Sequence, residues 1–180
     1  MSGPTEPRDP AGPGHVIVMG VSGCGKSTLA AALARATGRA FLEADDLHPA
    51  ANRALMTNGV PLTDADRLPW LRSVADRIAA SETATVTACS ALRRGYRDVL
   101  RTRVPGLWFV HLDGPVEILA ARLAARADHF MPRALLESQL ATLEPLDDDE
   151  PGVVVDLADA PEELVDHVSG LLAGLGSHHV

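Results

Sequence analysis

Lysine is nearly absent from this sequence of 180 residues, because 15 of its 16 basic residues are arginine and one, Lys26, is lysine. Positive charge is also outweighed, since 24 acidic residues give a net charge of −8. This balance argues against a protein that binds nucleic acid through a broad basic surface. A general preference for arginine explains the missing lysines, so the one lysine that is retained needs a reason of its own.

Aromatic residues, cysteines and long apolar runs are scarce as well. Aromatics make up 3% of the chain, so the core has to be built mainly from Ala, Val, Leu and Ile. Two cysteines cannot form a disulfide framework, and no apolar run approaches the roughly 18–20 residues that span a bilayer. Residues 1–14 are rich in Pro and Gly and lack an apolar signal core. We therefore expect a cytoplasmic protein without a membrane partner, with a disordered tail over 1–14 and a single domain over 15–180.

Short apolar segments alternate with helical patterns along that domain. The patterns predict strands at 15–20, 40–44, 85–89, 107–112 and 153–157, and helices at 26–37, 49–58, 64–81, 92–103, 115–127, 132–143 and 161–172. The acidic stretch 147–150 is predicted to be a solvated loop. This order favours an α/β fold with a five-stranded parallel sheet and helices on both faces. Such sheets bind ligands at the carboxyl ends of their strands.

The segment GVSGCGKS, from Gly20 to Ser27, fits the phosphate-loop pattern G-x-x-x-x-G-K-[ST] at every fixed position. It follows a predicted strand and opens a predicted helix, so backbone N–H groups and the helix dipole would both face phosphate. Lys26 is expected at the β- and γ-phosphates of ATP, and Ser27 is expected to bind Mg²⁺. The predicted nucleotide-binding residues are Gly20, Val21, Ser22, Gly23, Cys24, Gly25, Lys26, Ser27 and Thr28.

Two classes of nucleotide-binding protein do not fit. A GTPase would carry an N-K-x-D guanine motif, which a chain with one lysine, already used in the phosphate loop, cannot contain. A large motor or transporter ATPase would need more chain and an acid at the end of a later strand, whereas the third strand ends Thr87-Ala88-Cys89-Ser90. The remaining class is a small kinase that phosphorylates a metabolite or a nucleotide.

Residues after the second predicted strand are candidates for the acceptor side. Asp45 could accept the proton of an attacking hydroxyl or hold a Mg²⁺-bound water, and the alternative is that Asp45 or Asp46 caps the next helix. An acidic acceptor would need an arginine fork, for which Arg53, Arg67 and the pair 93–94 are candidates.

A second group of cations precedes the sequence Asp128-His129-Phe130-Met131. Arg122 and Arg126 lie one helical turn apart, where a lid could bring positive charge to the transferred phosphoryl group. The alternative is a helix with two exposed arginines.

Several segments together resemble the gluconokinase family of phosphate-loop kinases, which is related in fold to shikimate and adenylate kinases. They are MGVSGCGKST, DDLHPAAN, NGVPLTDADRLPWL, CSALRRGYRDVLR, FVHLDG and ARLAARADHFMPRALLESQLATLEP. The resemblance extends from about Val16 to the final helix. It implies ATP-dependent phosphorylation of D-gluconate at its 6-hydroxyl, with Mg²⁺, a mobile lid over about 122–135, acceptor-binding helices over about 45–81 and commonly a homodimer.

The resemblance also assigns residues by motif. Asp45 and His48 match the acid and histidine of D-x-L-H-P, and Arg67 matches the arginine before Pro-Trp-Leu. Cys89, Ser90, Arg97 and Asp98 match the C-S-A-L stretch, and Arg122, Arg126, His129 and Phe130 match the lid. The expected catalytic residues are Lys26, Asp45, Arg122 and Arg126; the expected substrate-binding residues are Asp45, His48, Asn52, Arg67, Arg93, Arg97 and His129. The chain departs from the family at Leu55 and Arg93, where lysine is usual or frequent, and at Ala44, where glycine is usual.

Other functions stay open from the sequence. A shikimate-type or nucleoside-monophosphate-type kinase could use the same fold. An ATP-binding regulator without turnover would keep the nucleotide site alone. A disulfide between Cys24 and Cys89 could also gate ATP binding, because Cys24 lies at a helix N-terminus.

Overall fold

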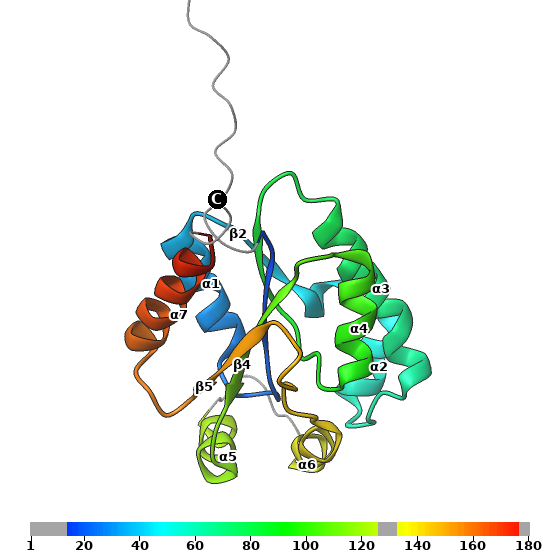
Figure 1. The fold of residues 1–180 in the computed structure, drawn as a ribbon. Helices are drawn as coiled ribbons and strands as arrows, with labels where there is room; N and C mark the ends of the chain where they lie inside the picture. Colours follow the sequence, from blue (N-terminus) through cyan, green and yellow to red (C-terminus); the bar gives the residue numbers. More distant parts are fainter. Residues whose placement is uncertain (1–13, 126–132, 177–180) are drawn as a thin grey trace, which may run out of the picture.

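A five-stranded parallel sheet forms the centre of the molecule, as predicted, in a computed structural model that describes residues 14–125 and 133–176 (Figure 1). The strand order is β2-β3-β1-β4-β5, so β1 lies in the middle of the sheet. The strands are β1 (Val16–Met19), β2 (Ala40–Glu43), β3 (Thr85–Ala88), β4 (Trp108–Asp113) and β5 (Gly152–Asp156). All four pairings are parallel, with Ile17 aligned between Thr87 and Phe109.

Helices cover both faces of the sheet and its carboxyl end. They are α1 (Lys26–Thr37), α2 (Ala50–Thr57), α3 (Asp64–Ala79), α4 (Arg94–Arg103), α5 (Val116–Ala124), α6 (Arg133–Thr142) and α7 (Pro161–Gly176), with a 3₁₀ helix η1 (Ala44–Leu47). In Figure 1, α1 and α7 lie on one side of the sheet, and α3 and α4 lie on the other. The same view places α5 and α6 below the sheet, where β4 ends.

Alternate residues of the central strand belong to two separate cores. Val16 and Val18 pack with Leu33 of α1 and Val168 of α7, whereas Ile17 and Met19 pack on the face of α3 and α4. All four residues of β1 are fully buried, which is why its sequence is a continuous apolar run rather than an alternating one. The carboxyl end of this buried strand leads directly into the phosphate loop.

Most predicted elements are confirmed within a few residues, and three differences matter for the site. The segment 44–47, whose first residue was predicted to end the strand 40–44, is a 3₁₀ helix, and no acidic side chain caps α2, which begins after Pro49. Helix α3 continues through Pro69 and starts with a capping box made by Thr63 and Asp66. The prediction that 147–150 is solvated is wrong for Glu150, which is buried.

Parts of the expected tail and lid lie outside the described residues, namely 1–13 and 126–132. Among the residues that the structure does describe, no helix has both the length and the apolar character needed to cross a membrane.

Candidate active site

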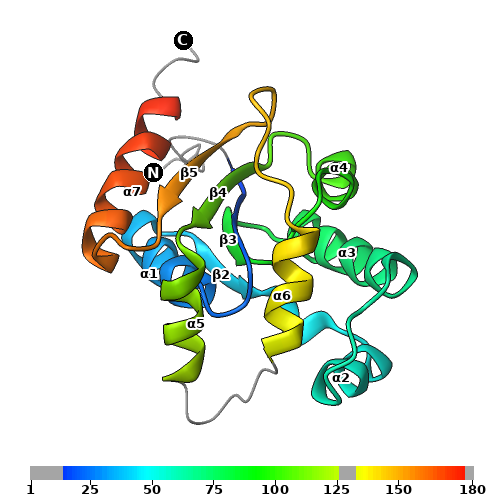
Figure 2. The same ribbon diagram turned by 90° about the horizontal axis from the view of Figure 1, so that it is seen from below.

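The phosphate loop connects β1 to the N-terminus of α1 and passes between α5 and α6 (Figure 2). Gly20 has a φ of +143°, and a Cβ there would lie 2.6 Å from the Leu112 carbonyl oxygen. Gly25, directly before α1, has a φ of +99°. Both positions therefore require glycine, because a side chain would clash or would have to adopt a left-handed backbone. The loop leaves free N–H groups and the positive end of the α1 dipole at one place.

Two side chains contact the peptide group between Val21 and Ser22. The Lys26 Nζ donates a hydrogen bond to the Val21 carbonyl oxygen at 3.0 Å. From the other side, Gln139 of α6 accepts a hydrogen bond from the Ser22 N–H at 2.7 Å and donates one to Ser22 Oγ at 3.0 Å. Helix α6 is thus joined to the phosphate loop by the side chain of Gln139.

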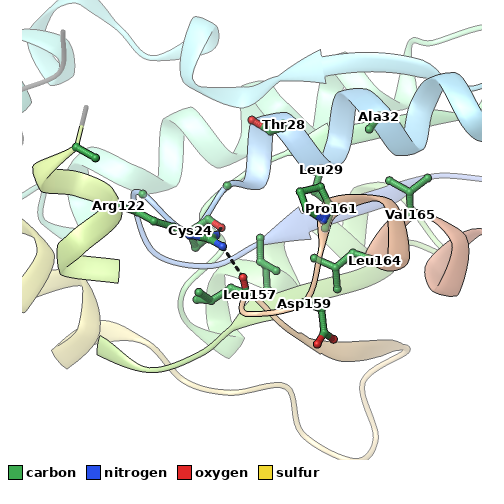
Figure 3. A pocket seen from close by; sticks show the side chains of 14 residues that line it. Cys24, Thr28, Leu29, Ala32, Arg122, Leu157, Asp159, Pro161, Leu164 and Val165 are labelled. Atoms are coloured by element: carbon green, nitrogen blue, oxygen red, sulfur yellow. Dashed lines mark hydrogen bonds between the residues drawn. The ribbon is translucent and has the colours of Figure 1, made fainter. Parts of the chain in front are cut away.

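An apolar cavity of about 310 Å³ opens on one side of the loop (Figure 3). Its walls come from the glycine turn, the first turns of α1, the end of β4, α5 and the segment from Leu157 to Val165. In Figure 3, Leu29 and Ala32 of α1 stand opposite Pro161, Leu164 and Val165. The mainly apolar walls next to the phosphate loop suit the base of a nucleotide.

Arg122 lines this cavity beside the phosphate loop. Its guanidinium donates a hydrogen bond to the Leu157 carbonyl oxygen at 2.6 Å (Figure 3) and another to the Cys24 carbonyl oxygen at 3.1 Å. The side chain is partly buried and lies beside the loop, and its role as a cation near phosphate stays a prediction. Arg126, His129 and Phe130, the other predicted lid residues, lie outside the described part of the chain.

A smaller and more polar cavity, of about 100 Å³, opens on the opposite side of the loop. Lys26, Asp45, His48 and Arg67 line it together with Ser22, Met56, Pro61, Leu62, Trp70, Ser90, Leu92, Ser138 and Gln139. Predicted residues from three separate motifs are therefore brought to one cavity. Asn52 does not line the cavity but lies behind His48.

His48 is held in place by its neighbours. Its ring stacks on Trp70 with the ring centroids 4.0 Å apart and the planes 12° from parallel. Asn52 Nδ2 lies 3.3 Å from His48 Nδ1 and donates to the Asp66 carbonyl, so the other ring nitrogen, Nε2, is directed toward Asp45 at 3.8 Å. Burial lowers the pKa of His48 despite the opposing effect of Asp45. At neutral pH the ring is therefore uncharged and can present an Nε2–H donor to a ligand.

Arg67 belongs to a network of polar side chains at the rim of the same cavity. Its guanidinium donates to the Tyr96 hydroxyl at 3.1 Å, and the Tyr96 hydroxyl in turn donates to Asp64. Burial and the hydrogen bond to Asp64 raise the pKa of Tyr96. Arg93 pairs with Asp64 at 3.1 Å and does not line the cavity. Of these two predicted anion-binding arginines, only Arg67 reaches the cavity.

Ser27 and Glu43 place oxygen atoms next to Lys26. Ser27 Oγ donates a hydrogen bond to Glu43 Oε2 at 2.6 Å, and Glu43 is the last residue of the edge strand β2. Burial raises the pKa of Glu43, with a further contribution from the nearby Asp45 carboxylate and an opposing one from Ser27. The described residues contain no cluster of three or more His, Cys, Asp or Glu side chains that could bind a metal by themselves. Hydroxyl and carboxylate oxygens of this kind fit Mg²⁺, which is usually held by one or two protein groups together with substrate phosphates and water.

Arg97, which the sequence suggested as a substrate-binding residue, lies away from the cavity and is fully buried. It makes two hydrogen bonds of 2.7 Å to the carboxylate of Glu150. It also donates to the carbonyl oxygens of Ala91, Glu144 and Pro145 at 3.0–3.2 Å. All of its donor groups point into this buried network, so the prediction that Arg97 contacts substrate is wrong. Its role is to join α4 to the segments before β5.

The structure does not contain the disulfide between Cys24 and Cys89 that the sequence left open. Both cysteines are free and buried, and they belong to the two different cores on opposite faces of the sheet. Burial raises the pKa of the Cys89 thiol to about 12, so it is protonated at neutral pH and a poor nucleophile.

Polar and aromatic side chains that contact the predicted site residues, but were not themselves predicted, include Gln139, Trp70, Tyr96 and Glu43. The first three lie inside motifs that carry the family resemblance, ESQLATLEP, RLPWL and GYRD. The scarcity of Trp and Tyr in the chain could have drawn attention to Trp70 and Tyr96. Gln139 and Glu43 carry no comparable signal, because polar residues of these types are common on exposed surfaces.

Comparisons with known proteins agree with this geometry. A family model described as an AAA domain matches residues 16–146. The chain is 48% identical over 163 residues to a gluconokinase of Gluconobacter oxydans (strain 621H), covering 86% of this chain and 91% of that protein. It is 44% identical over 142 residues to the thermosensitive gluconokinase of Escherichia coli (strain K12), covering 77% and 75% of the two chains.

Solved structures give the same result. A gluconokinase from Sinorhizobium meliloti 1021 superposes with a TM-score of 0.85 at 47% identity, covering 92% of this chain and 94% of that one. A shikimate kinase from Aquifex aeolicus, at 17% identity and a TM-score of 0.57, shares the fold over 91% of this chain and 99% of that one. With this identity, coverage and fold, the chain belongs to the gluconokinase family.

Proposed function

We propose that this protein transfers the γ-phosphoryl group of ATP to the 6-hydroxyl of D-gluconate, giving ADP and 6-phosphogluconate. The observation that carries the proposal is the position of the phosphate loop between two unlike cavities. One is apolar and suits a nucleotide base, and the other presents Lys26, Asp45, His48 and Arg67 to a small polar acceptor. The high identity to proteins named gluconokinase supports gluconate as that acceptor.

Gluconate has one carboxylate and a chain of hydroxyl groups, and the smaller cavity offers partners for both. Among the described residues, Arg67 is the arginine that lines it, so we assign the carboxylate of gluconate to Arg67. The neutral His48 ring offers an N–H donor, and the Asp45 carboxylate offers an acceptor for hydroxyl groups. Asn52 acts behind them by fixing the orientation of the His48 ring.

In the transfer step, the 6-hydroxyl oxygen forms a bond to the γ-phosphorus while the bond to the β–γ bridging oxygen breaks and leaves ADP. Asp45 would accept the hydroxyl proton, because it is the carboxylate that lines the acceptor cavity beside Lys26. Lys26 would leave the Val21 carbonyl and place its ammonium at the β- and γ-phosphates. Arg122, with Arg126, would add positive charge from α5 and the segment after it.

Mg²⁺ would bind at Ser27, with Glu43 and Asp45 able to hold its water ligands. When bound, it would neutralise charge on the β- and γ-phosphates. We place the reaction in the cytoplasm, where two free cysteines stay reduced.

The test is a coupled ADP-release assay with Mg²⁺ and ATP and with separate acceptors: D-gluconate, shikimate, AMP, CMP and other sugar acids. We expect turnover with gluconate and little with the others. Arg67→Met should raise the KM for gluconate strongly and leave the KM for ATP near its original value, with Arg53→Met as the matched control outside the cavity. Turnover with shikimate or a nucleotide but not gluconate would overturn the acceptor assignment. Binding of ATP without turnover on any acceptor would identify a regulator instead.

A further inference from the structure

The Val21–Ser22 peptide group is held at both of its polar ends by side chains, one from the same loop and one from α6. Lys26 binds its carbonyl oxygen, and Gln139, 117 residues away from Ser22 in the sequence, binds its N–H. Gln139 also donates to Ser22 Oγ, so its amide uses both of its functions on one residue of the phosphate loop. A buried or half-buried backbone N–H needs such a partner, and here a side chain of α6 provides it.

The two halves of the phosphate loop face different cavities. Gly23, Cys24 and Gly25 line the base cavity, whereas Ser22 and Lys26 line the acceptor cavity. A phosphoryl group can reach an acceptor only if it lies on the acceptor side, so the terminal phosphate of ATP must lie near Ser22 and Lys26. The two phosphates of ADP would bind to the backbone N–H groups of the glycine turn and of the N-terminus of α1. The Ser22 N–H is therefore a donor for the third phosphate, and Gln139 now occupies it.

A phosphate oxygen competes well with this amide. Charge-assisted hydrogen bonds to an anionic oxygen are about twice as strong as those between neutral groups. The end of α6 is also anchored independently, because the Glu144 N–H donates to the Leu92 carbonyl at 2.7 Å and the Glu144 carboxylate accepts from the Arg94 N–H at 2.7 Å. Gln139 can therefore leave Ser22 by a change of its own side chain while the helix keeps its attachment to α4.

We propose that Gln139 is a specificity-determining residue that competes with the terminal phosphate of ATP for the Ser22 N–H and so lowers the affinity for ATP relative to ADP. This inference rests on the nucleotide half of the proposed function and not on gluconate. After transfer, the return of Gln139 to Ser22 replaces the phosphoryl group at the same N–H. The contact thereby gives the Ser22 N–H a hydrogen-bond partner when no triphosphate is bound, and it opposes retention of the phosphorylated product.

The experiment measures the dissociation constants of ADP and of the non-hydrolysable analogue AMPPNP by calorimetry in the presence of Mg²⁺. Gln139→Ala should bind AMPPNP about fivefold to tenfold more tightly, the effect of one to two neutral hydrogen bonds, and ADP should change less than about twofold. Gln139→Glu should weaken AMPPNP binding, because a carboxylate keeps the Ser22 N–H and repels phosphate. Thr142→Ala, on the same helix but outside the lining of the cavity, is the matched control and should shift neither nucleotide.

Several results would overturn the proposal. Weaker AMPPNP binding by Gln139→Ala would make Gln139 a ligand of the terminal phosphate, and equal shifts for both nucleotides, or none, would leave it only a packing role. Ser22→Ala removes the hydrogen bond between Gln139 and Ser22 Oγ from the loop side and should tighten AMPPNP binding by about twofold to threefold. This variant replaces Gln139→Ala if that protein does not fold. The titrations need no acceptor, so failure of gluconate turnover in the unmodified protein would be seen separately.

Discussion

Replacement of Arg97 by methionine would test whether this buried arginine holds the fold or contacts the substrate. Arg97 and Glu150 have fully buried side chains 2.7 Å apart. Burial by itself would raise the pKa of Glu150, but the hydrogen bonds from Arg97 and from the Asp147 backbone hold that pKa below its usual value. The Arg97→Met variant leaves the carboxylate of Glu150 buried without its partner and removes three hydrogen bonds to carbonyl oxygens.

The expected loss follows from these contacts. Removing one partner of a buried ion pair costs about 3–5 kcal/mol in the free energy of unfolding. This is a large part of the roughly 5–15 kcal/mol that stabilises a typical domain. For a chain of this length it corresponds to a fall of about 6–20 °C in Tm. The double variant Arg97→Met/Glu150→Leu should lose less than the single variant, because no unpaired buried charge remains.

Urea unfolding followed by circular dichroism measures these differences, and the coupled assay gives KM and kcat for the folded fraction. We expect a large loss of stability for Arg97→Met, with little change in the KM for gluconate. A free energy of unfolding within about 1 kcal/mol of the original, together with a strongly raised KM for gluconate, would refute the reasoning and return Arg97 to the substrate site.

Three further predictions concern single residues. If Asp45 is the base, Asp45→Asn should lower kcat up to about 100-fold and leave the affinity for AMPPNP near normal. Asp46→Asn, at the next position and also exposed, is the control and should leave kcat unchanged. Loss of nucleotide affinity alone would make Asp45 a residue that holds the water ligands of the metal. An amine-acylating reagent should modify Lys26, which is the one lysine of the chain, and MgATP should protect it. Equal labelling in mass spectra with and without MgATP would contradict the assignment of Lys26 to the phosphates of ATP. Burial lowers the pKa of His111 below 6.5, and neither ring nitrogen has a hydrogen-bond partner in the described structure. Just below pH 6.5 the unfolded state therefore binds a proton on this histidine while the folded state does not, so the free energy of unfolding falls as pH falls. His111→Leu should make this acid-side fall in unfolding free energy smaller, while His48 retains its part; an unchanged slope in urea titrations from pH 7 to about 5 would contradict it.

Local features of the sequence were sufficient for the fold and for the phosphate loop. Helix α1 begins and ends where predicted, since Gly25 and Gly38 both take left-handed backbone conformations at its two ends. The buried strands are readable because each is a short apolar run next to a turn. The phosphate loop is readable because its function depends on backbone geometry encoded by neighbouring residues.

Partners distant in the sequence could not be predicted in the same way. Arg97 looks like any arginine on an amphipathic helix, and Glu150 closes an acidic stretch that otherwise is exposed. Only the packing of α4 against the segment before β5 shows that the two are paired. The same applies to Gln139, whose contact with Ser22 depends on where α6 lies and not on any local pattern.

The central position of β1 has a consequence for how such a protein can change over evolution. Its loop separates a nucleotide half, built from α1, α5, α7 and the ends of β4 and β5, from an acceptor half, built from η1, α2, α3, α6 and the segment after β3. Among the described residues, the linings of the two cavities have no residue in common, although Leu92 and Leu136 of the acceptor half pack in the same core as α1, α5 and α7. Substitutions that line the acceptor cavity can therefore change the acceptor while the residues that line the nucleotide cavity, and with them the phosphate donor, stay the same.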